Sequence, residues 1–226
     1  SPYFHFGQIS THEVFEKISN LESWSPESID PKMVGRREGW WGGTENLESF
    51  MDELITWREL GYHTCVRRAN YNQYSSLPEW AIKTLHEHST DEREHIYSLD
   101  ELTYSQTHDE IWNAAQNQLR TQGIIQNYLR MLWGKKILEW TPNPQLALSY
   151  MITLNDRFSL DGRDPNSYSG VFWILGRYDR AWGPERSIYG KIRYMTSDST
   201  AKKFNLKPYL EKWSNESLGV VTSFQK

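Results

Sequence analysis

Most of the residues that could take part in catalysis or cofactor binding lie between positions 130 and 195. Apolar residues recur at helical spacing over 124–140, which predicts a helix that ends before Thr141-Pro142. Trp133 and Trp140 are seven residues apart, so they share one face of this helix at a distance of two turns. Arg130 precedes Trp133 by about one turn on the same face.

A polar loop over 159–169 follows the next predicted helix and carries Asp161 and Arg163 among Gly, Pro and Asn residues. A helix bearing Trp and Arg beside an Asp/Arg loop could hold a large, planar, anionic cofactor. The same residues also fit a Trp-rich core helix followed by an ordinary loop. Residue types alone leave both interpretations open.

Composition indicates a globular chain without a membrane span. Of 226 residues, 38% are hydrophobic and 24% charged, and no apolar run approaches the roughly 20 residues that cross a bilayer. The single cysteine, Cys65, excludes an internal disulfide and a zinc site built on cysteines. No HExxH spacing is present, so no metal is expected. Eleven Trp residues are several times the ordinary usage and suit either aromatic ligands or a large core.

The net charge of −4 conceals a division of charge along the chain. Residues 1–119 carry 9 Lys or Arg and 20 Asp or Glu, a balance of −11, whereas residues 120–212 carry 15 and 8, a balance of +7. This division is typical of a protein that presents one face to a polyanion.

Start and stop signals predict a many-helix protein. Ser10 to Glu13, Ser98 to Glu101 and Thr107 to Glu110 have the spacing of capping boxes. No convincing strand alternation occurs, so the fold class is all-α, and no GxGxxG or P-loop is present. Helices are expected over 11–20, 45–61, 78–86, 107–123, 124–140, 144–158, 185–194 and 205–213, with a further turn of helix after Ser98.

Residues 22–44 are expected to form an inserted loop, because Pro and Gly recur through them. The segment 35–43 holds Trp40 and Trp41 between glycines. It is either a functional surface loop or a plug packed on the core, and the plug is favoured because exposed paired Trp residues are costly.

Several segments resemble class II DNA photolyases in the right order. Residues 1–10 resemble the start of the flavin-binding domain, and 130–141 resemble the class II signature. Residues 154–166 and 190–195 resemble further family motifs, so the resemblance covers almost the whole chain.

The resemblance implies an all-helical domain that binds FAD, in which the reduced anionic flavin absorbs blue light and passes an electron to a cyclobutane pyrimidine dimer flipped out of UV-damaged DNA. It implies a monomer whose partner is DNA and which does not bind a membrane. Such a protein is expected in the cytoplasm or nucleoid of a bacterium or archaeon, or in the nucleus of a eukaryote.

The resemblance also assigns roles at the cofactor. Trp133 would lie nearest the flavin, with Trp112 and Trp140 completing a relay that photoreduces it, and Asn155 would lie beside flavin N5. The expected cofactor-binding residues are Ser1, Gln8, Arg58, Arg130, Asn155, Asp161 and Arg163. A fixed cation near the ring would favour the anionic flavin.

On the DNA side, Glu53 matches the acid that hydrogen-bonds the lesion. Trp57 and Trp173 match the aromatics that stack on the flipped dimer, and Met131 fits beneath it. Arg180 and Trp182 match residues that enter the space left in the duplex, where they would offset lost stacking.

The family pattern implies a domain over 1–213 with a tail over 214–226. The family's N-terminal α/β antenna domain and any antenna chromophore on it are missing from the sequence, which is interpreted as a fragment because it begins without Met. Two alternatives remain: a cryptochrome-like blue-light receptor without repair activity, and a flavin-free fragment.

Overall fold

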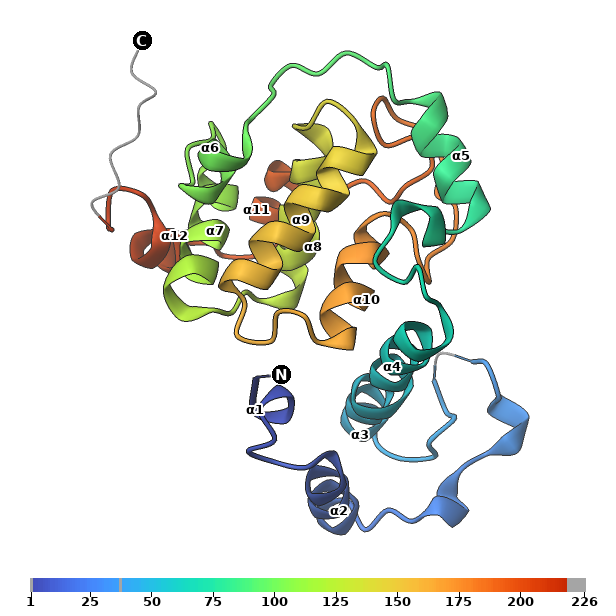
Figure 1. Ribbon diagram of the computed structural model, residues 1–226. Helices are drawn as coiled ribbons and strands as arrows, with labels where there is room; N and C mark the ends of the chain where they lie inside the picture. The colour runs from blue at the N-terminus through green and yellow to red at the C-terminus, as the bar shows by residue number, and fades with distance from the viewer. Residues whose placement is uncertain (1, 37, 219–226) are drawn as a thin grey trace. The chain divides into compact units, whose positions relative to one another are not determined.

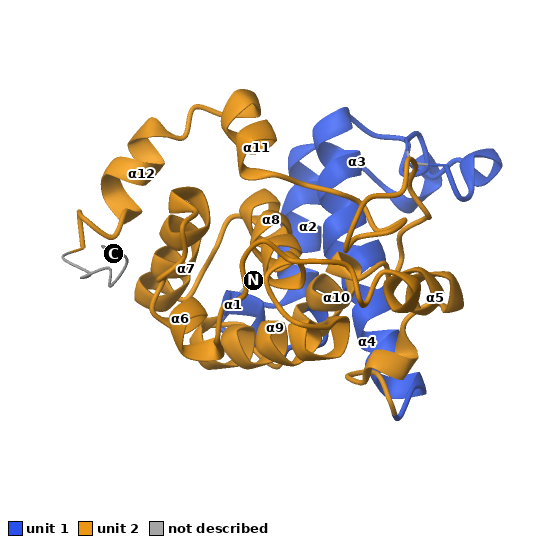
Figure 2. Ribbon diagram, turned by 90° about the horizontal axis from the view of Figure 1, so that it is seen from above, with its two compact units in different colours: residues 1–69, 164–166 blue, residues 70–163, 167–226 orange. Residues whose placement is uncertain are grey.

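The computed structural model describes residues 2–36 and 38–218. The chain divides into two compact units (Figure 2): unit 1 holds residues 1–69 and 164–166, and unit 2 holds 70–163 and 167–226. Helices make up the regular structure of the described residues, where the only β pairing is an isolated bridge between Arg186 and Gly190. The prediction of an all-α fold is confirmed.

Unit 1 begins with two helices. Its helix α2 is capped by Ser10, whose hydroxyl accepts the N–H of Glu13 at 3.0 Å, as the spacing of these residues predicted. The helices and 3₁₀ turns of unit 1 before residue 44 are α1 (Pro2–His5), α2 (Thr11–Leu21), η1 (Pro26–Ser28) and η2 (Pro31–Met33), followed in Figure 1 along the blue part of the chain.

The helix expected over 45–61 is longer and of mixed type. It consists of α3 (Glu45–Met51), the π-helical segment η3 (Asp52–Trp57) and α4 (Arg58–Arg67). A π segment widens one turn and often marks a functional site. The apolar spacing over 45–61 predicts a helix but does not locate this widened turn, which is only six residues long.

The loop over 35–43 is a plug, as favoured. Trp41 is buried and packs with Trp24, Leu47 and Met51 in a small core of unit 1. The carboxylate of Glu48 accepts the backbone N–H groups of Gly39 at 2.6 Å and Gly42 at 2.7 Å, which fixes the turn. The turn over 39–42 is therefore held from within unit 1, and that residues 22–44 are an insertion stays a prediction.

Unit 2 contains the larger core. Its central helix α8 (Asn127–Glu139) contacts both α7 (Glu110–Gln122) and α9 (Pro144–Phe158), and all three are labelled in Figure 1. The other elements of unit 2 are η4 (Tyr74–Ser76), α5 (Glu79–Glu87), α6 (Leu99–Thr103), α11 (Ser197–Lys203), α12 (Lys207–Trp213) and most of α10 (Pro165–Ile174). Glycine allows close packing at Gly134, where an added Cβ would overlap the side chain of Ile174.

Several boundaries in unit 2 differ from the sequence predictions. Ser98 and Glu101 form the predicted capping box, but Thr107 does not cap α7, since Asp109 accepts the N–H of Trp112 at 3.0 Å and is the N-cap. α10 occupies the second half of the expected 159–169 loop and the apolar run after it. The helix expected over 185–194 is wrong, because Ile188 and Gly190 adopt positive φ values of 68° and 52°.

Candidate functional site

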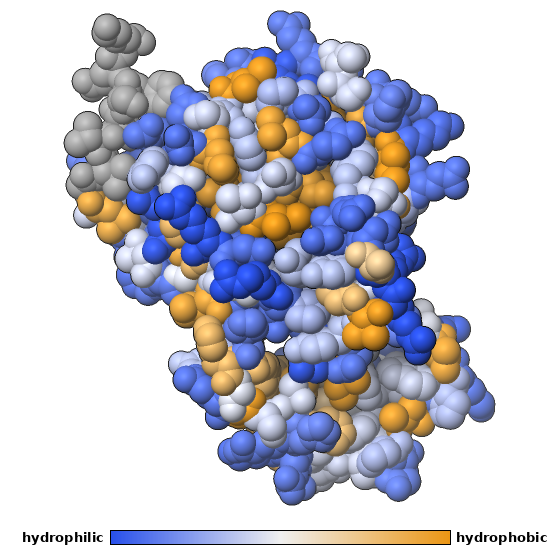
Figure 3. Space-filling model, viewed as in Figure 1, coloured by the Kyte–Doolittle hydropathy of each residue, from blue (hydrophilic) through white to orange (hydrophobic). Residues whose placement is uncertain are grey.

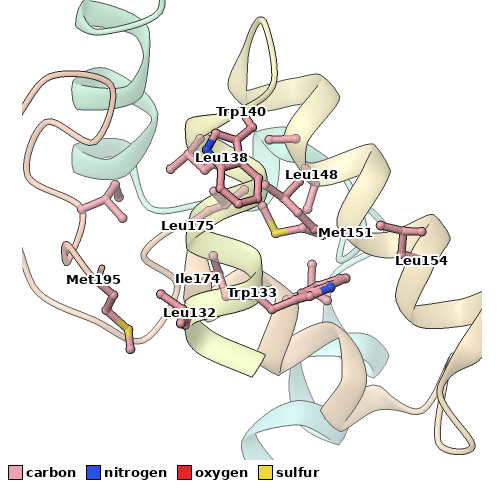
Figure 4. Packing of buried hydrophobic residues seen from close by; sticks show 14 of the residues in the cluster. Leu132, Trp133, Leu138, Trp140, Leu148, Met151, Leu154, Ile174, Leu175 and Met195 are labelled. Carbon is pink, nitrogen blue, oxygen red and sulfur yellow. The ribbon is translucent and has the colours of Figure 1, made fainter. Parts of the chain in front are cut away.

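The three tryptophans of the predicted relay are brought together in the core of unit 2. Trp112 of α7 and Trp133 of α8 are 0% and 1% exposed, and Trp140, the C-cap of α8, is 1% exposed. Figure 4 shows Trp133 and Trp140 packed among apolar side chains that include Leu148, Met151 and Leu154 of α9. Because these side chains are closely packed, the rings hold fixed positions.

Trp112 is the link between the other two tryptophans. Its indole N–H donates to the backbone carbonyl of Trp133 at 2.9 Å, and its ring meets that of Trp140 edge to face, with centroids 5.6 Å apart. The indole N–H of Trp133 donates to Oε1 of Gln116 at 2.8 Å. Orbital overlap falls steeply with distance, so this contiguous set of rings and peptide groups is suited to passing an electron.

Further aromatic side chains surround Trp140 on the other side. The ring of Tyr97 lies 5.4 Å from that of Trp140, and its hydroxyl is 2.7 Å from Nδ1 of His108. Burial lowers the pKa of His108, and the neighbouring imidazole of His95 lowers it further. His95, His108 and Trp140 line part of a cavity of about 500 Å³.

A polar cluster lies at the start of α8 and the end of α9. The Arg130 guanidinium donates to Oδ1 of Asn155 at 2.5 Å, and the Asn155 amide nitrogen donates to the hydroxyl of Ser167. Asn155 is almost fully buried, and Arg130 is half-buried. Burial lowers the pKa of Arg130, and the charge of the Asp161 carboxylate only partly offsets this effect.

Asp161 is charged in this setting. Burial alone would raise its pKa, but the pKa is lowered overall, and the hydrogen bond from the Ser159 hydroxyl, at 2.6 Å, and the charge of Arg130 are among the causes. The sequence prediction that Arg130, Asn155 and Asp161 belong to one region is consistent with this geometry. What each residue binds stays a prediction.

Arg163 is held differently. Its backbone N–H donates to the carboxylate of Asp156 at 3.0 Å and its guanidinium to the Asp156 carbonyl at 3.1 Å. Its φ of 67° is an uncommon value for a residue with a side chain. Such strain is found at functional sites, although the guanidinium here contacts the backbone of Asp156 and not Arg130 or Asn155.

The turn after α10 brings together the residues predicted to enter the duplex. The guanidinium carbon of Arg180 lies 4.3 Å from the centroid of the Trp182 ring, and the Trp182 indole N–H donates to Asp179 at 3.1 Å. Arg180 is exposed and Trp182 is half-buried. An exposed cation on an aromatic ring is a common element of nucleic-acid binding.

Glu53 and Trp57 lie on the π segment η3 of unit 1, four residues apart. Glu53 is exposed and has no hydrogen-bond partner among the described residues, and partial desolvation, with the nearby charge of Asp52, raises its pKa. Trp57 is half-buried. An acid of this kind is free to bond an external group.

The remaining predicted residues are distributed over both units. In unit 1, Arg58 pairs with Glu59 at 2.7 Å, and Gln8 is exposed in the turn after α1. In unit 2, Met131 packs on the core from α8, and Trp173 of α10 meets Tyr178 edge to face at 6.1 Å. Ser1 lies outside the described residues.

Sequence reasoning missed the partners of the functional side chains. Gln116 and Ser167 accept hydrogen bonds from Trp133 and Asn155, and Tyr97 borders Trp140. A signal was available for Gln116, since it lies four residues after Trp112 on the same buried helix face, where a polar residue needs a partner.

The described residues offer neither a metal cluster nor a membrane-spanning helix. Among the described residues, no group of three or more His, Cys, Asp and Glu side chains could hold a metal ion. None of the described helices has both the length and the apolar character required to span a bilayer. The face shown in Figure 3 is mainly hydrophilic, with smaller groups of apolar residues between the polar ones.

Comparison with known proteins gives a consistent set of relatives, although no family model matches the chain. It is 42% identical over 212 residues, 94% of its length, to the deoxyribodipyrimidine photo-lyase of Methanothermobacter thermautotrophicus, of which it spans 42%. It is 40% identical over 211 residues, or 93%, to the enzyme of that name from Arabidopsis thaliana, spanning 39% of it. It is also 40% identical over 215 residues to the deoxyribodipyrimidine photo-lyase of Potorous tridactylus, a match that covers 95% of this chain and 37% of the relative.

These relatives come from an archaeon, a plant and a mammal, and each is matched by nearly the whole of this chain. The chain is therefore homologous to part of proteins that carry the name deoxyribodipyrimidine photo-lyase. It spans about two fifths of their length.

Proposed function

We propose that this chain is the flavin-binding and lesion-binding part of a photolyase of class II, which repairs cyclobutane pyrimidine dimers in UV-damaged DNA with light. The observation that carries the proposal is the buried assembly of Trp112, Trp133 and Trp140 within a helical unit, in a chain about 40% identical to photo-lyases over nearly all its length. The segments 130–141 and 154–166 support class II, because they match its signature.

The polar cluster fits a flavin, and FAD is the proposed form. The Arg130 guanidinium has no hydrogen-bond partner besides Asn155 among the described residues, so further N–H donors remain for a ligand. The Asn155 amide likewise has a second N–H beyond the one given to Ser167. Donors and a fixed cation beside a ring suit an anionic flavin. When bound and reduced, the flavin supplies the light-driven electron that splits the dimer.

The protein's own residues then have separate tasks. Arg130 and Asn155 would orient the flavin, with Asp161 holding the charge of Arg130 in place and Arg163, Arg58, Gln8 and Ser1 as further proposed contacts. The tryptophans would supply electrons that restore the reduced cofactor. Their burial keeps water from the rings, and closely packed neighbours prevent movement that would break the contacts.

Binding of the lesion is proposed for a second set of residues. Glu53 would hydrogen-bond the dimer, Trp57, Trp173 and Met131 would pack on it, and Arg180 and Trp182 would fill the space from which it flips. Desolvation disfavours the charged form of Glu53 and raises its pKa. The protonated carboxyl group can donate a hydrogen bond as well as accept one, and either suits a contact with the dimer.

The test is light-dependent loss of cyclobutane dimers from UV-irradiated DNA, measured with the flavin-loaded, reduced protein in blue light and in darkness. We expect dimers to disappear only in light. Flavin loaded without repair would favour a cryptochrome-like receptor, and a colourless protein that takes up no flavin would favour the flavin-free alternative. The relatives from Methanothermobacter thermautotrophicus, Arabidopsis thaliana and Potorous tridactylus all carry the name deoxyribodipyrimidine photo-lyase, which favours repair.

A further inference from the structure

Trp182 carries two guanidinium groups, not one. The guanidinium carbon of Arg193 lies 4.9 Å from the centroid of the Trp182 ring, and that of Arg180 lies 4.3 Å from it. Trp182 is held at two points: its indole N–H donates to Asp179 at 3.1 Å, and its backbone N–H donates to the carbonyl of Lys191 at 2.9 Å. Arg193, eleven residues beyond Trp182, therefore shares one rigid platform with Arg180.

The positive charge of this platform is not neutralised within unit 2. Arg180 and Arg193 are both exposed, and neither forms an ion pair in the described part of the chain. One carboxylate contacts this platform: Oδ1 of Asp179 accepts the Trp182 indole N–H at 3.1 Å and the backbone N–H of Arg180 at 2.8 Å. Two guanidiniums on one ring repel one another, and a bound anion would relieve that repulsion.

A nearby lysine shows the contrasting case. The backbone carbonyl of Lys191 accepts the N–H of Trp182, and the Lys191 ammonium pairs with Glu185 at 3.1 Å. Its charge is thus balanced within the protein. Of the cations around this turn, the two on Trp182 lie on one ring without an ion pair in the described residues, and Arg186 lies over a different ring, that of Tyr194, at 4.7 Å.

We propose that Arg193 contacts the phosphodiester backbone of DNA and that Arg180 and Arg193, both mounted on Trp182, each bind one phosphate. This inference rests on the proposed function and adds to it a contact that the family motifs do not assign. Planar guanidiniums bind phosphate through paired N–H groups, and stacking on an aromatic ring orients that plane in advance. In this arrangement Trp182 spaces and aims the two cations.

The test is the salt dependence of DNA binding by the flavin-loaded protein in darkness, on a duplex containing one thymine dimer. Each phosphate contact contributes about 0.9 to the slope of log affinity against log salt concentration. Arg193→Gln should therefore reduce the slope by about one, and the Arg180→Gln, Arg193→Gln double variant by about two. Arg193→Lys keeps the charge and should retain most of the slope.

The control is the double variant Glu185→Gln, Lys191→Gln, which removes an internal ion pair without changing net charge and should leave the slope unaltered. If Arg193→Gln weakens binding equally at every salt concentration, with the slope of the wild type, Arg193 only supports Trp182 and the inference is overturned. A wild-type protein that binds no damaged DNA would overturn the proposed function as well, which separates the two failures.

Discussion

Trp133 and Trp182 place the same side chain in two opposite environments of unit 2. Trp133 is 1% exposed, and its N–H meets the neutral amide oxygen of Gln116. Trp182 is half-buried, its N–H meets a carboxylate, and its ring faces two guanidiniums. A ring that gives up an electron becomes a cation, which neighbouring guanidiniums disfavour. Electron transfer is therefore suited to Trp133, and binding of an anion is suited to the surroundings of Trp182.

The largest expected effect comes from Trp133→Phe. Phenylalanine is much harder to oxidise than tryptophan, so the electron supply through Trp112 should be interrupted, and photoreduction of bound oxidised flavin should slow by at least about 100-fold, or 2.7 kcal/mol in the barrier. Flavin absorbance during blue illumination measures this rate. Repair by chemically reduced protein should be retained.

Trp182→Phe is the matched control for that substitution. It should leave photoreduction at the wild-type rate and alter only DNA binding, because its ring is outside the set formed by Trp112, Trp133 and Trp140. If Trp133→Phe removed repair and photoreduction equally, the relay role would be wrong. If Trp182→Phe slowed photoreduction, the division between the two environments would be lost.

Lys135 is next in expected effect, because its amine is fully buried within unit 2. Its amine donates to the carbonyl of Ile174, and burial lowers its pKa to about 7, opposed by the charge of Asp179. The unfolded chain then binds more protons than the folded chain between pH 7 and about 10.5, so stability should rise with pH across that window. Two pH units correspond to about 2.7 kcal/mol at most.

Urea unfolding at pH 7.5 and 9.5 measures this change. The wild type should gain stability between the two values, and Lys135→Met should remove most of the gain. Lys191→Met, which replaces an exposed and ion-paired lysine, should keep the wild-type pH dependence. An equal gain in wild type and Lys135→Met would show that Lys135 stays charged in the folded protein.

Gln116→Leu tests whether the neutral partner of Trp133 matters to the buried environment. The substitution leaves a buried indole N–H without its acceptor, and we expect a loss of about 1–3 kcal/mol in the free energy of unfolding. Thermal unfolding gives the comparison with Gln122→Leu, an exposed glutamine at the end of the same helix, which should change stability little. Equal stability of the two variants would contradict the importance of this bond.

The sequence predicts the buried environment better than the exposed one. Helices α2, α8 and α9 follow from apolar spacing and from stop or cap residues such as Ser10 and Pro142, which act over a few positions. The same spacing predicts Trp133 and Trp140 on one helix, and in the structure Trp133 lies within α8 and Trp140 is its C-cap. Interactions local in sequence leave a readable pattern.

Contacts between distant segments leave no such pattern. The chain over 185–194 is expected to be helical from its composition, but Asp91 accepts the N–H of Ile188 at 2.8 Å and Thr84 accepts that of Lys191 at 3.0 Å, so tertiary contacts determine its path. The meeting of Arg193 with Trp182 depends on that path. It could not be derived before the structure, and neither could the widened turn at η3.

The smallest expected effect extends the comparison to unit 1, where Glu53 is an exposed acid without a partner in the described residues. If it supplies one hydrogen bond to the lesion, Glu53→Ala should lower the repair yield roughly threefold, as the net value of such a bond implies, while bound flavin is unchanged. Glu53→Gln keeps the hydrogen-bonding capacity and should retain most of the yield. Dimer loss per absorbed photon, with flavin absorbance as the control for cofactor content, measures both. An unchanged yield in Glu53→Ala would remove this acid from the lesion site and leave DNA recognition to the arginine-bearing turn of unit 2.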